Sequence, residues 1–440
     1  MTNALTHRRM IVFHGGQRSK VEGQREKNKQ MKKIVATRSI PASNILNISI
    51  IFAYVIFGLI TCNSVTVNAQ VLGANYNHDP IYMDFEYIEK SGVGWVRTTP
   101  RILDFYFNNV DIETDKGLQN VIEAGKRGYK ISFGFRWDFR RYNLDIPDPD
   151  SELERELFDL QHRILNMLSP YVNQFKLGNE PNLETKRADM FPGQDGVIPL
   201  VRFTERQLEQ VVIPFFKDHP EIRSPQIFIG SFPRMFMPDE QAVPAVQELI
   251  RMAHENDHIT GLAVHLHISK LEQIDESFEF VRSIMPDKPI IIPEFSLHRL
   301  YLEKREEKLG NSPEGMAFCA KYGRDPELLL YQWCGIANTY RMNPQEWQDL
   351  FYSRDWFPKN YLQVYREKYK QYGVILATFP LFQQSCPQNM TPTSPMWFIN
   401  PVFSQKSLMI QEDGAFSPNL LVYDDYITWA RETRDVDILK

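Results

Sequence analysis

The sequence predicts an α/β fold, a (β/α)8 TIM barrel with a long helical insertion between the seventh and eighth strands. From Gln70 onward, short apolar segments alternate with amphipathic ones. This alternation is typical of parallel strands, because their connections cross over as helices. Eight apolar segments are predicted to be strands: 71–76, 94–98, 130–135, 174–177, 226–230, 261–265, 289–292 and 374–379.

The segments between these strands have the periodicity of helices. In residues 152–168, leucine and isoleucine recur every three or four positions and so form one apolar face. Further helices are predicted at 205–217, 241–255 and 274–284. Residues 71–385 are enough for eight strand–helix units, since such barrels typically take roughly 250 residues.

Two later regions depart from simple alternation. Residues 301–372 are much longer than one crossover needs, and we expect several helices there, over or beside the mouth of the barrel, where they would shape a site. Residues 386–440 contain proline-rich turns and a predicted closing helix at 421–431. No linker divides this part of the chain, so residues 70–440 are expected to form one domain.

Residues 1–69 are predicted to be a targeting segment. A basic stretch is followed by an apolar run at 45–62 and by small residues at 67–69 that resemble a signal-peptidase cleavage site. Met31 is a more ordinary start for such a signal peptide than Met1. The alternatives are an uncleaved membrane anchor and a lipoprotein signal ending at Cys62. All three interpretations imply a secreted or otherwise extracytoplasmic protein. Contact with a membrane is expected only through this segment.

The composition excludes several classes of protein. The net charge is only −5, and no long charge run follows the N-terminal segment, which argues against a nucleic-acid partner. No CxxC motif or Cys/His spacing of a metal site occurs, and no cofactor is expected. Cleavage before Gln70 would leave Cys319, Cys334 and Cys386, which we expect to be buried thiols rather than a disulfide framework.

Two of the predicted strands end in a glutamate. Glu180 follows the fourth strand in the sequence Gly-Asn-Glu-Pro, and Glu294 follows the seventh in Pro-Glu-Phe. The carboxyl ends of barrel strands meet at one face, so these side chains are expected to face each other across the mouth. Two such carboxylates are the minimum equipment for hydrolysing a glycosidic bond: one donates a proton while the other attacks the sugar or activates water.

This arrangement resembles the clan of retaining glycoside hydrolases built on (β/α)8 barrels. The resemblance covers approximately residues 71–382 and assigns no single family within the clan. It implies that Glu180 is the acid/base, that Glu294 is the nucleophile, and that Asn179 holds the sugar 2-hydroxyl. It also implies an oligosaccharide, polysaccharide or glycoside substrate, and carboxyl groups about 5 to 5.5 Å apart.

The resemblance also implies roles for residues at other strand ends. Arg97, at the end of the second strand, would keep the nucleophile ionised, or would instead form a salt bridge within the barrel. His265 would contact the sugar or orient the nucleophile, and His267 shares its face of the strand. One of the two histidines could instead pack beneath the loops. We expect Arg97 and His265 to lie nearer to Glu294 than to Glu180.

Aromatic and amide side chains complete the predicted substrate site. Asn75 lies at the end of the first strand and Trp137 follows the third, and they are predicted to bind sugar by hydrogen bonding and stacking. Many clan members carry a tryptophan after the eighth strand, where this chain has Phe379. Phe379, or Trp333 or Trp356 from the insertion, is expected to replace it.

Two other functions remain open from the sequence. A metal-dependent barrel hydrolase would use His265 and His267 as ligands, with Glu180 or Glu294 completing the set. A catalytically inactive carbohydrate-binding barrel would keep the groove without the reaction, although a binding site has no need of paired carboxylates. The sequence therefore favours a secreted glycosidase that acts with retention.

Overall fold

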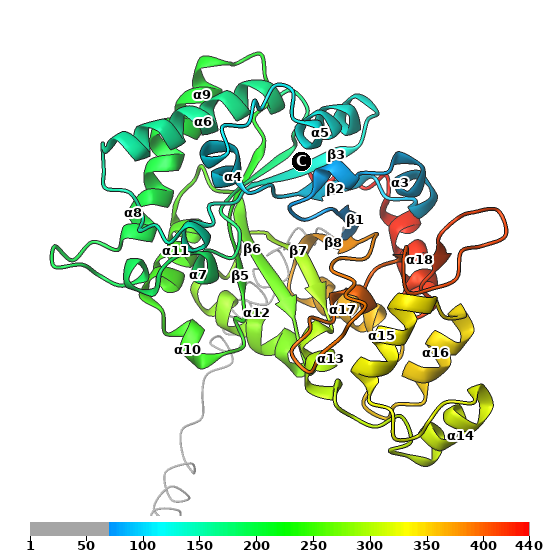
Figure 1. Ribbon diagram of the computed structural model, residues 1–440. Helices are drawn as coiled ribbons and strands as arrows, with labels where there is room; N and C mark the ends of the chain where they lie inside the picture. Colours follow the sequence, from blue (N-terminus) through cyan, green and yellow to red (C-terminus); the bar gives the residue numbers. More distant parts are fainter. Residues whose placement is uncertain (1–69, 440) are drawn as a thin grey trace, which may run out of the picture. The chain divides into compact units, whose positions relative to one another are not determined.

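The computed structural model describes residues 70–439, and these contain a closed barrel of eight parallel strands in sequence order (Figure 1). The predicted (β/α)8 fold and all of its strands are therefore confirmed. The targeting segment predicted at 1–69 lies outside the described residues. The strands are β1 (Val71–Asn75), β2 (Trp95–Thr98), β3 (Lys130–Phe135), β4 (Gln174–Leu177), β5 (Gln226–Pro233), β6 (Gly261–His267), β7 (Ile290–Ser296) and β8 (Val374–Pro380).

Strands β5, β6 and β7 extend beyond their predicted ends. Their last residues include serine, histidine, proline and glutamate, which as sequence are typical of loops. In the barrel these residues still pair with neighbouring strands, for example His267 with Ser296. The extension matters because it puts polar side chains on rigid strands rather than on loops.

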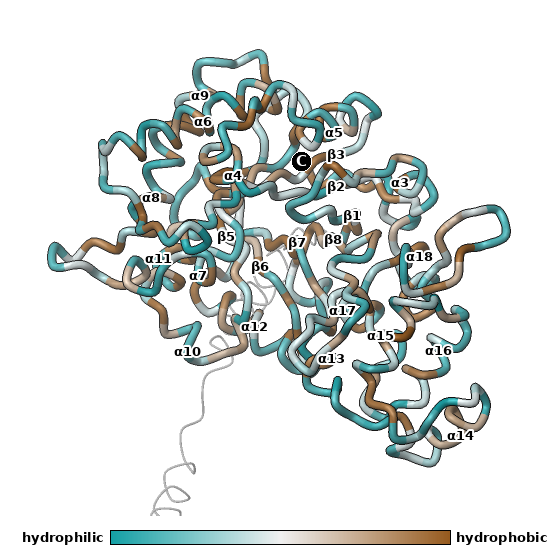
Figure 2. The backbone as a smooth tube through the Cα atoms, in the orientation of Figure 1, coloured by the Kyte–Doolittle hydropathy of each residue, from teal (hydrophilic) through white to brown (hydrophobic). Residues whose placement is uncertain are grey.

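Helices cover the outside of the barrel (Figure 1). Figure 2 shows hydrophobic and hydrophilic positions alternating along them, as expected where one side packs on strands and the other meets solvent. Those preceding β7 are α3 (Phe85–Ser91), α4 (Ile102–Phe107), α5 (Lys116–Lys126), α6 (Glu152–Leu168), α7 (Pro181–Glu184), α8 (Pro199–Arg206), α9 (Ile213–Asp218), α10 (Pro238–Gln241), α11 (Pro244–Glu255) and α12 (Glu272–Ile284).

The predicted helix at 152–168 matches α6, and α12 matches its prediction to within two residues at its start. The helix predicted at 205–217 is part of a longer run in which a π-helical segment, η4 (Gln207–Val212), joins α8 to α9. The helix predicted at 241–255 is divided, because Pro244 starts a new helix, α11. Short 3-10 turns complete this half: η1 (Pro80–Tyr82), η2 (Phe139–Tyr142) and η3 (Arg187–Met190).

The insertion between β7 and β8 is helical, as predicted. It comprises α13 (His298–Lys304), α14 (Pro313–Tyr322), α15 (Leu330–Tyr340), α16 (Pro344–Tyr352) and α17 (Tyr361–Gln371). Trp333 and Trp347, with ring centroids 5.4 Å apart, form its buried centre. Helix α17 packs on the barrel itself, since the Tyr365 ring lies 4.9 Å from that of Phe295 on β7.

The C-terminal region closes the barrel as predicted. It contains η5 (Trp397–Ile399), a small antiparallel pair of β9 (Phe403–Ser404) and β10 (Ser417–Pro418), and the helix α18 (Tyr423–Thr433). Trp429 on α18 donates from its indole to the carbonyl of Gln70, at 2.7 Å. The Thr433 hydroxyl accepts from the backbone N–H of Leu72, at 3.2 Å, so α18 is fastened to β1.

The barrel interior is divided into an apolar half and a polar half. Trp95 and Phe228 belong to a buried apolar cluster near the N-terminal ends of the strands, and Ile438 of the C-terminal tail joins it. Towards the C-terminal ends, the buried interior side chains include Arg97, His265 and other polar residues. The polar groups therefore rest on an apolar floor.

Two further expectations can be compared with the described residues. The thiols of Cys319, Cys334 and Cys386 are all free, as expected, and the first two are buried. Within residues 70–439, no helix combines the length and apolar character needed to cross a bilayer.

The close approach of β6 to β7 leads to a stability prediction. A Cβ atom added at Gly261 would lie 2.0 Å from the carbonyl oxygen of Pro289, so the two strands would have to separate. We expect Gly261→Ala to destabilise the protein by about 1–3 kcal/mol or more, measured as a lower thermal unfolding midpoint. Gly193→Ala is the control, since its Cβ would lie 3.0 Å from a side-chain oxygen of Asp195 and 3.6 Å from the nearest backbone atom, the carbonyl oxygen of Val197. Equal midpoints for the two variants would contradict the tight strand packing.

Candidate active site

An extra residue in β7 turns Glu294 into the barrel. Ala263 on β6 pairs with Ile291, but the next register pair is His265 with Glu294. Three steps on β7 thus oppose two on β6, which is a β-bulge. The bulge includes Pro293, whose missing N–H would weaken a regular ladder. It shifts the alternation of side chains, so that Glu294 faces the interior.

Glu180 reaches the mouth through a left-handed turn after β4. Its backbone φ is 42°, a value that non-glycine residues rarely adopt, and its N–H donates to the carbonyl of Ser231, at 3.0 Å. Gly178, two residues earlier, has φ 106°. Backbone strain of this kind persists where the surroundings enforce it, and functional sites are a common location.

Arg97 joins the two sides of the site. It is fully buried, and Nη1 donates to Oε1 of Glu294 at 2.6 Å and to Oδ1 of Asn75 at 2.9 Å. Its Nη2 donates to Oδ1 of Asn179 at 2.8 Å. The expected position of Arg97 beside Glu294 is thus present in the structure.

The carboxyl group of Glu294 is strongly held in its ionised form. Burial alone would raise its pKa. The neighbouring His265 and Arg97, and a hydrogen bond with His267, outweigh burial and hold the pKa of Glu294 well below its usual range. The ionised form of Glu294 is therefore favoured.

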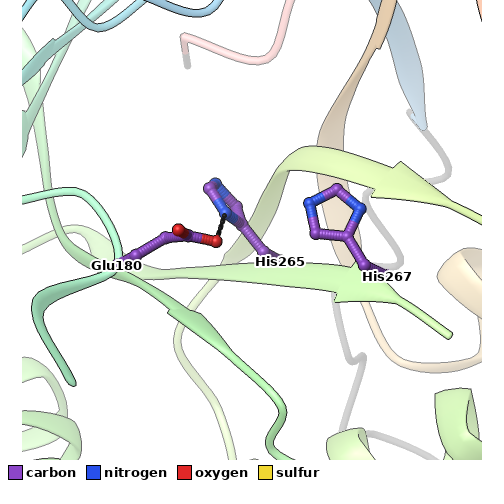
Figure 3. Close-up of side chains that lie close together, drawn as sticks. All are labelled: Glu180, His265 and His267. Carbon is purple, nitrogen blue, oxygen red and sulfur yellow. Dashed lines mark hydrogen bonds and ion pairs between the residues drawn. The ribbon is translucent and has the colours of Figure 1, made fainter. Parts of the chain in front are cut away.

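His265 contacts both glutamates, and Figure 3 shows its contact with Glu180. Its Nδ1 is 3.1 Å from Oε1 of Glu180, whereas its Nε2 is 3.7 Å from Oε1 of Glu294. The expectation that His265 lies nearer to Glu294 is therefore wrong. The physical reason is that Arg97 already occupies that oxygen of Glu294 at 2.6 Å, while the other edge of the imidazole faces Glu180.

His267 takes the place beside Glu294 that was expected of His265. Its Nε2 is 3.4 Å from Oε2 of Glu294, and its Nδ1 is 2.8 Å from Oγ of Ser296. Both histidines come from one face of β6, as the spacing in the sequence predicts. Together they give each glutamate its own imidazole neighbour.

The proton between Glu180 and His265 can lie on either residue. Burial raises the pKa of Glu180, but the contact with His265 outweighs it and lowers that pKa. Burial likewise lowers the pKa of His265, which keeps the ring neutral near pH 7. Nδ1–H then donates to the carboxylate, or a protonated Glu180 donates to bare Nδ1. The pair can therefore accept or release a proton.

A third glutamate, Glu184, was not predicted. It lies at the end of α7, four residues after Glu180, and accepts from Nδ2 of Asn179 at 2.9 Å and from Nη2 of Arg136 at 2.7 Å. Burial raises the pKa of Glu184 to about 8, even against the charge of Arg136. The signal available in the sequence was the spacing, since residues four apart on a helix share a face.

The two glutamates lie in a pocket of about 800 Å³ at the carboxyl ends of the strands. Residues after β1 and β8, and the segment 382–416, form most of its wall. Trp397 from η5 lies in this wall, stacked on His298 with ring centroids 3.4 Å apart and edge-on to His267 at 4.8 Å. It comes from the C-terminal region, where we did not expect an aromatic side chain of the pocket.

Two predicted substrate residues are not available to the pocket. Phe379 is fully buried, with its ring 5.0 Å from that of Phe295. Trp137 is 5% exposed and stacks on Phe139 at 6.3 Å, within an aromatic cluster outside the barrel. Strand-end aromatics thus turned outward, where helices cover them, whereas Asn75 does line the pocket.

The insertion contributes to the site differently from the expectation. Its tryptophans do not line the pocket: Trp333 is buried within the insertion, and the indole of Trp356 donates to Glu307 at 2.9 Å. Arg341, directly after α15, is its contribution to the wall. Helix α15 also supports the C-terminal segment, because Asn338 donates to the carbonyl of Pro387 at 2.8 Å.

Three side chains of the site have the donor atoms of a metal centre. Glu180, His265 and His267 each offer one ligand atom, and these atoms lie within 4.8 Å of one another (Figure 3). One carboxylate and two imidazoles are a ligand set found in catalytic zinc sites. The charge of Arg97, 2.6 Å from Glu294, works against a cation here.

Comparisons with other proteins are distant. No protein-family model matches the sequence, and no curated protein matches it. A psychrophilic glycoside hydrolase family 10 endo-beta-1,4-xylanase is similar in structure, with 11% identity, a TM-score of 0.43, and coverage of 84% of this chain and 98% of that one. An exo-beta-1,4-mannosidase from Opitutaceae bacterium strain TAV5 has 12% identity, a TM-score of 0.47, and coverage of 82% and 59%. A beta-glucosidase from Thermotoga maritima has 10% identity, a TM-score of 0.45, and coverage of 82% and 86%. Similarity this distant establishes no family, so the chemistry rests on the residues of this chain.

The pKa of Glu184 leads to a prediction about stability and pH. The unfolded carboxyl ionises near its usual value of 4.5, whereas the folded one keeps its proton up to about 8. The contribution of Glu184 to stability is therefore present below pH 4.5 and is lost as the pH rises towards 8. Glutamine cannot ionise, so we expect the thermal midpoint of Glu184→Gln to rise relative to wild type over this range.

The matched control for this experiment is Glu205→Gln, which changes an exposed glutamate on α8. Its midpoint should follow that of wild type at every pH. A constant difference between Glu184→Gln and wild type across the range would contradict a proton held on Glu184 by burial.

Proposed function

We propose that this protein is a glycoside hydrolase that cleaves O-glycosidic bonds with retention of configuration. The observation that carries this proposal is the pairing of Glu180 and Glu294 across one imidazole, 3.1 and 3.7 Å from its nitrogens, in a pocket of about 800 Å³. Two carboxylates on either side of a sugar-sized pocket are what this reaction requires. Retention calls for carboxyl groups about 5 to 5.5 Å apart; that separation stays a prediction.

Glu294 is the nucleophile in this proposal. Its carboxylate, kept ionised beside Arg97, attacks the anomeric carbon and forms an ester bond to the sugar while the bond to the leaving oxygen breaks. His267 and Arg97 hold the two carboxylate oxygens from different directions, at 3.4 and 2.6 Å. The attacking group is thus oriented before substrate arrives.

Glu180 is the acid and then the base. It protonates the leaving oxygen in the first step and removes a proton from water in the second. Burial and the negative charge of Glu294 act to raise the pKa of Glu180, although the contact with His265 outweighs them; formation of the ester removes the charge of Glu294. The pKa of Glu180 therefore falls after the first step, and Glu180 is ionised when a base is required.

Asn179 and Trp397 are the proposed substrate contacts. Asn179 is held at both ends of its amide, by Arg97 and by Glu184, and it lines the pocket, which suits a fixed hydrogen bond to a sugar hydroxyl. Trp397 offers the aromatic face that Phe379 does not. We also propose that residues 1–69 direct the enzyme out of the cytoplasm, on the strength of the apolar run at 45–62.

A metal-dependent hydrolase is the second candidate. The ligand atoms of Glu180, His265 and His267 favour it. Metal analysis of the purified protein, with activity measured before and after chelation, separates the two mechanisms. Activity that is lost on chelation and restored by zinc supports the metal, whereas activity that survives chelation supports the glutamate pair.

The nucleophile assignment predicts a covalent intermediate. Activated 2-fluoro glycosides, which react but release slowly, are expected to label the peptide containing Glu294, as detected by mass spectrometry. Glu294→Gln should remain unlabelled and lose turnover by about 10⁴-fold or more. It should also be less stable, because Arg97 is left buried without a counter-charge.

Two observations make this test decisive. Glu303→Gln, an exposed glutamate on α13, should be labelled and active like wild type. A label on any other residue, or a fully active Glu294→Gln, would show that Glu294 is not the nucleophile.

The acid/base assignment predicts a dependence on the leaving group. We expect Glu180→Ala to slow natural glycosides by roughly 10² to 10⁴-fold, the usual contribution of general acid catalysis. Aryl glycosides with acidic phenols need little protonation, so their bond-breaking step should slow much less. Equal losses on both kinds of substrate would instead assign Glu180 a binding role.

A further inference from the structure

The pocket wall carries an excess of positive charge. Apart from Glu180 and Glu294, its ionisable carboxylate is Asp79, while its cationic side chains are Arg101, Arg136, Arg341 and Lys406. Asp79 lies 3.2 Å from His78, which also lines the pocket. A neutral sugar needs hydrogen-bond donors, but amides and hydroxyls supply them without the cost of gathering like charges.

Arg341 is held in place at the rim of this pocket. Its backbone φ is 58°, in the left-handed region that favours glycine, so its position is maintained against backbone strain. The next residue, Met342, donates to the carbonyl of Ser407 at 2.8 Å and accepts from the N–H of Met409 at 2.9 Å. Nη1 of Arg341 reaches the carbonyl of Leu408 at 3.5 Å.

Lys406 belongs to the segment that Arg341 contacts. Its backbone N–H donates to Oε1 of Gln383 at 2.7 Å, which fixes the chain while the exposed amine remains free to move. In the part of the chain that the structure describes, neither Lys406 nor Arg341 forms an ion pair with a carboxylate. Two cations on adjoining segments of one rim thus lack counter-charges.

The charge of the other two cationic side chains in the wall, Arg101 and Arg136, is only partly compensated. Arg101 and Arg136 share Asp138, whose Oδ2 is 3.7 Å from the first and 3.8 Å from the second. The Nε atoms of both arginines are buried without a hydrogen-bond partner. Arg136 also pairs with Glu184 at 2.7 Å, and burial raises the pKa of that carboxyl to about 8, so part of this counter-charge is missing at neutral pH.

We propose that the substrate is an acidic glycan, whose oxyanion, a uronate carboxylate or a sulfate ester, binds to Arg341 and Lys406 at the rim. This rests on the proposed glycoside hydrolase function, which it deepens by naming the substrate class. Guanidinium and ammonium groups bind carboxylates and sulfates through charge-assisted hydrogen bonds. The remaining arginines raise the local potential, and so draw an anionic chain towards the pocket.

Calorimetric binding tests this inference without requiring turnover. The protein is the full chain with Glu180→Gln, which keeps the shape of the site and suppresses hydrolysis. Three matched trisaccharides serve as probes: one neutral, one with a uronate residue, and one with an O-sulfate. We expect at least one acidic probe to bind about tenfold more tightly than the neutral probe or better, with the preference weakening as salt rises.

The variants Arg341→Gln and Lys406→Gln, separately and together, locate the binding. Each is expected to weaken the acidic probe by about tenfold and to leave the neutral probe nearly unchanged. Lys217→Gln, an exposed lysine on α9, is the matched control and should change neither. The acidic probe that binds more tightly identifies carboxylate or sulfate as the recognised group.

The inference is overturned if the neutral trisaccharide binds as tightly as both acidic ones, if the variants weaken all probes alike, or if no probe binds. Its failure differs from failure of the proposed function. If the wild-type protein hydrolyses neutral and acidic glycans equally well, the proposed hydrolase function stands and the acidic substrate is wrong. If the wild-type protein binds acidic probes but hydrolyses no glycan, the anion-binding site stands and the proposed hydrolase function is wrong.

Discussion

The buried ion pair between Arg97 and Glu294 is the interaction on which the rest of the site depends. A guanidinium cannot release its proton in a protein, so a fully buried Arg97 must be compensated where it lies. Its donors reach Asn75, Asn179 and Glu294, which stand at the ends of β1, β4 and β7. Removing one member of such a pair typically costs about 3–5 kcal/mol. One charge therefore constrains three strands of the barrel.

The surroundings of this ion pair keep the guanidinium of Arg97 directed at Glu294. Lys176 lies on β4, fully buried, and its Nζ has no hydrogen-bond partner. Burial, together with the positive charge of Arg97, lowers the pKa of Lys176 well below its usual value, which disfavours the charged amine. Lys176 thus does not compete with Arg97 for the carboxylate. The apolar floor around Trp95 and Phe228 also strengthens the attraction within the pair, because apolar side chains screen charges less than water does.

The parts of this site that the sequence predicts are those with a local cause. Apolar runs ending in polar residues identify the strands, and so bring Glu180, Glu294 and Arg97 to one face. The partner of His265 has no local cause, since it depends on the bulge in β7 and the left-handed turn at Glu180. The prediction that Phe379 contacts the substrate is wrong for the same reason, since a shift of one residue in register reverses the direction of a strand side chain. Trp397 reaches the pocket only because a distant segment folds back over β8.

The features with local causes and those with distant causes lie in different parts of the molecule, the barrel strands and the rim. Rigid strand ends hold the two glutamates, Arg97 and the histidines, where small displacements would disturb the reaction. The rim comes from the middle of the insertion and from the C-terminal segment, which are joined to each other through Met342, Ser407 and Asn338. Residues such as Arg341 and Lys406 can therefore change without altering the register of the strands. Under the proposed function, the chemistry is then set by the barrel, and the choice of substrate by the segments laid over it.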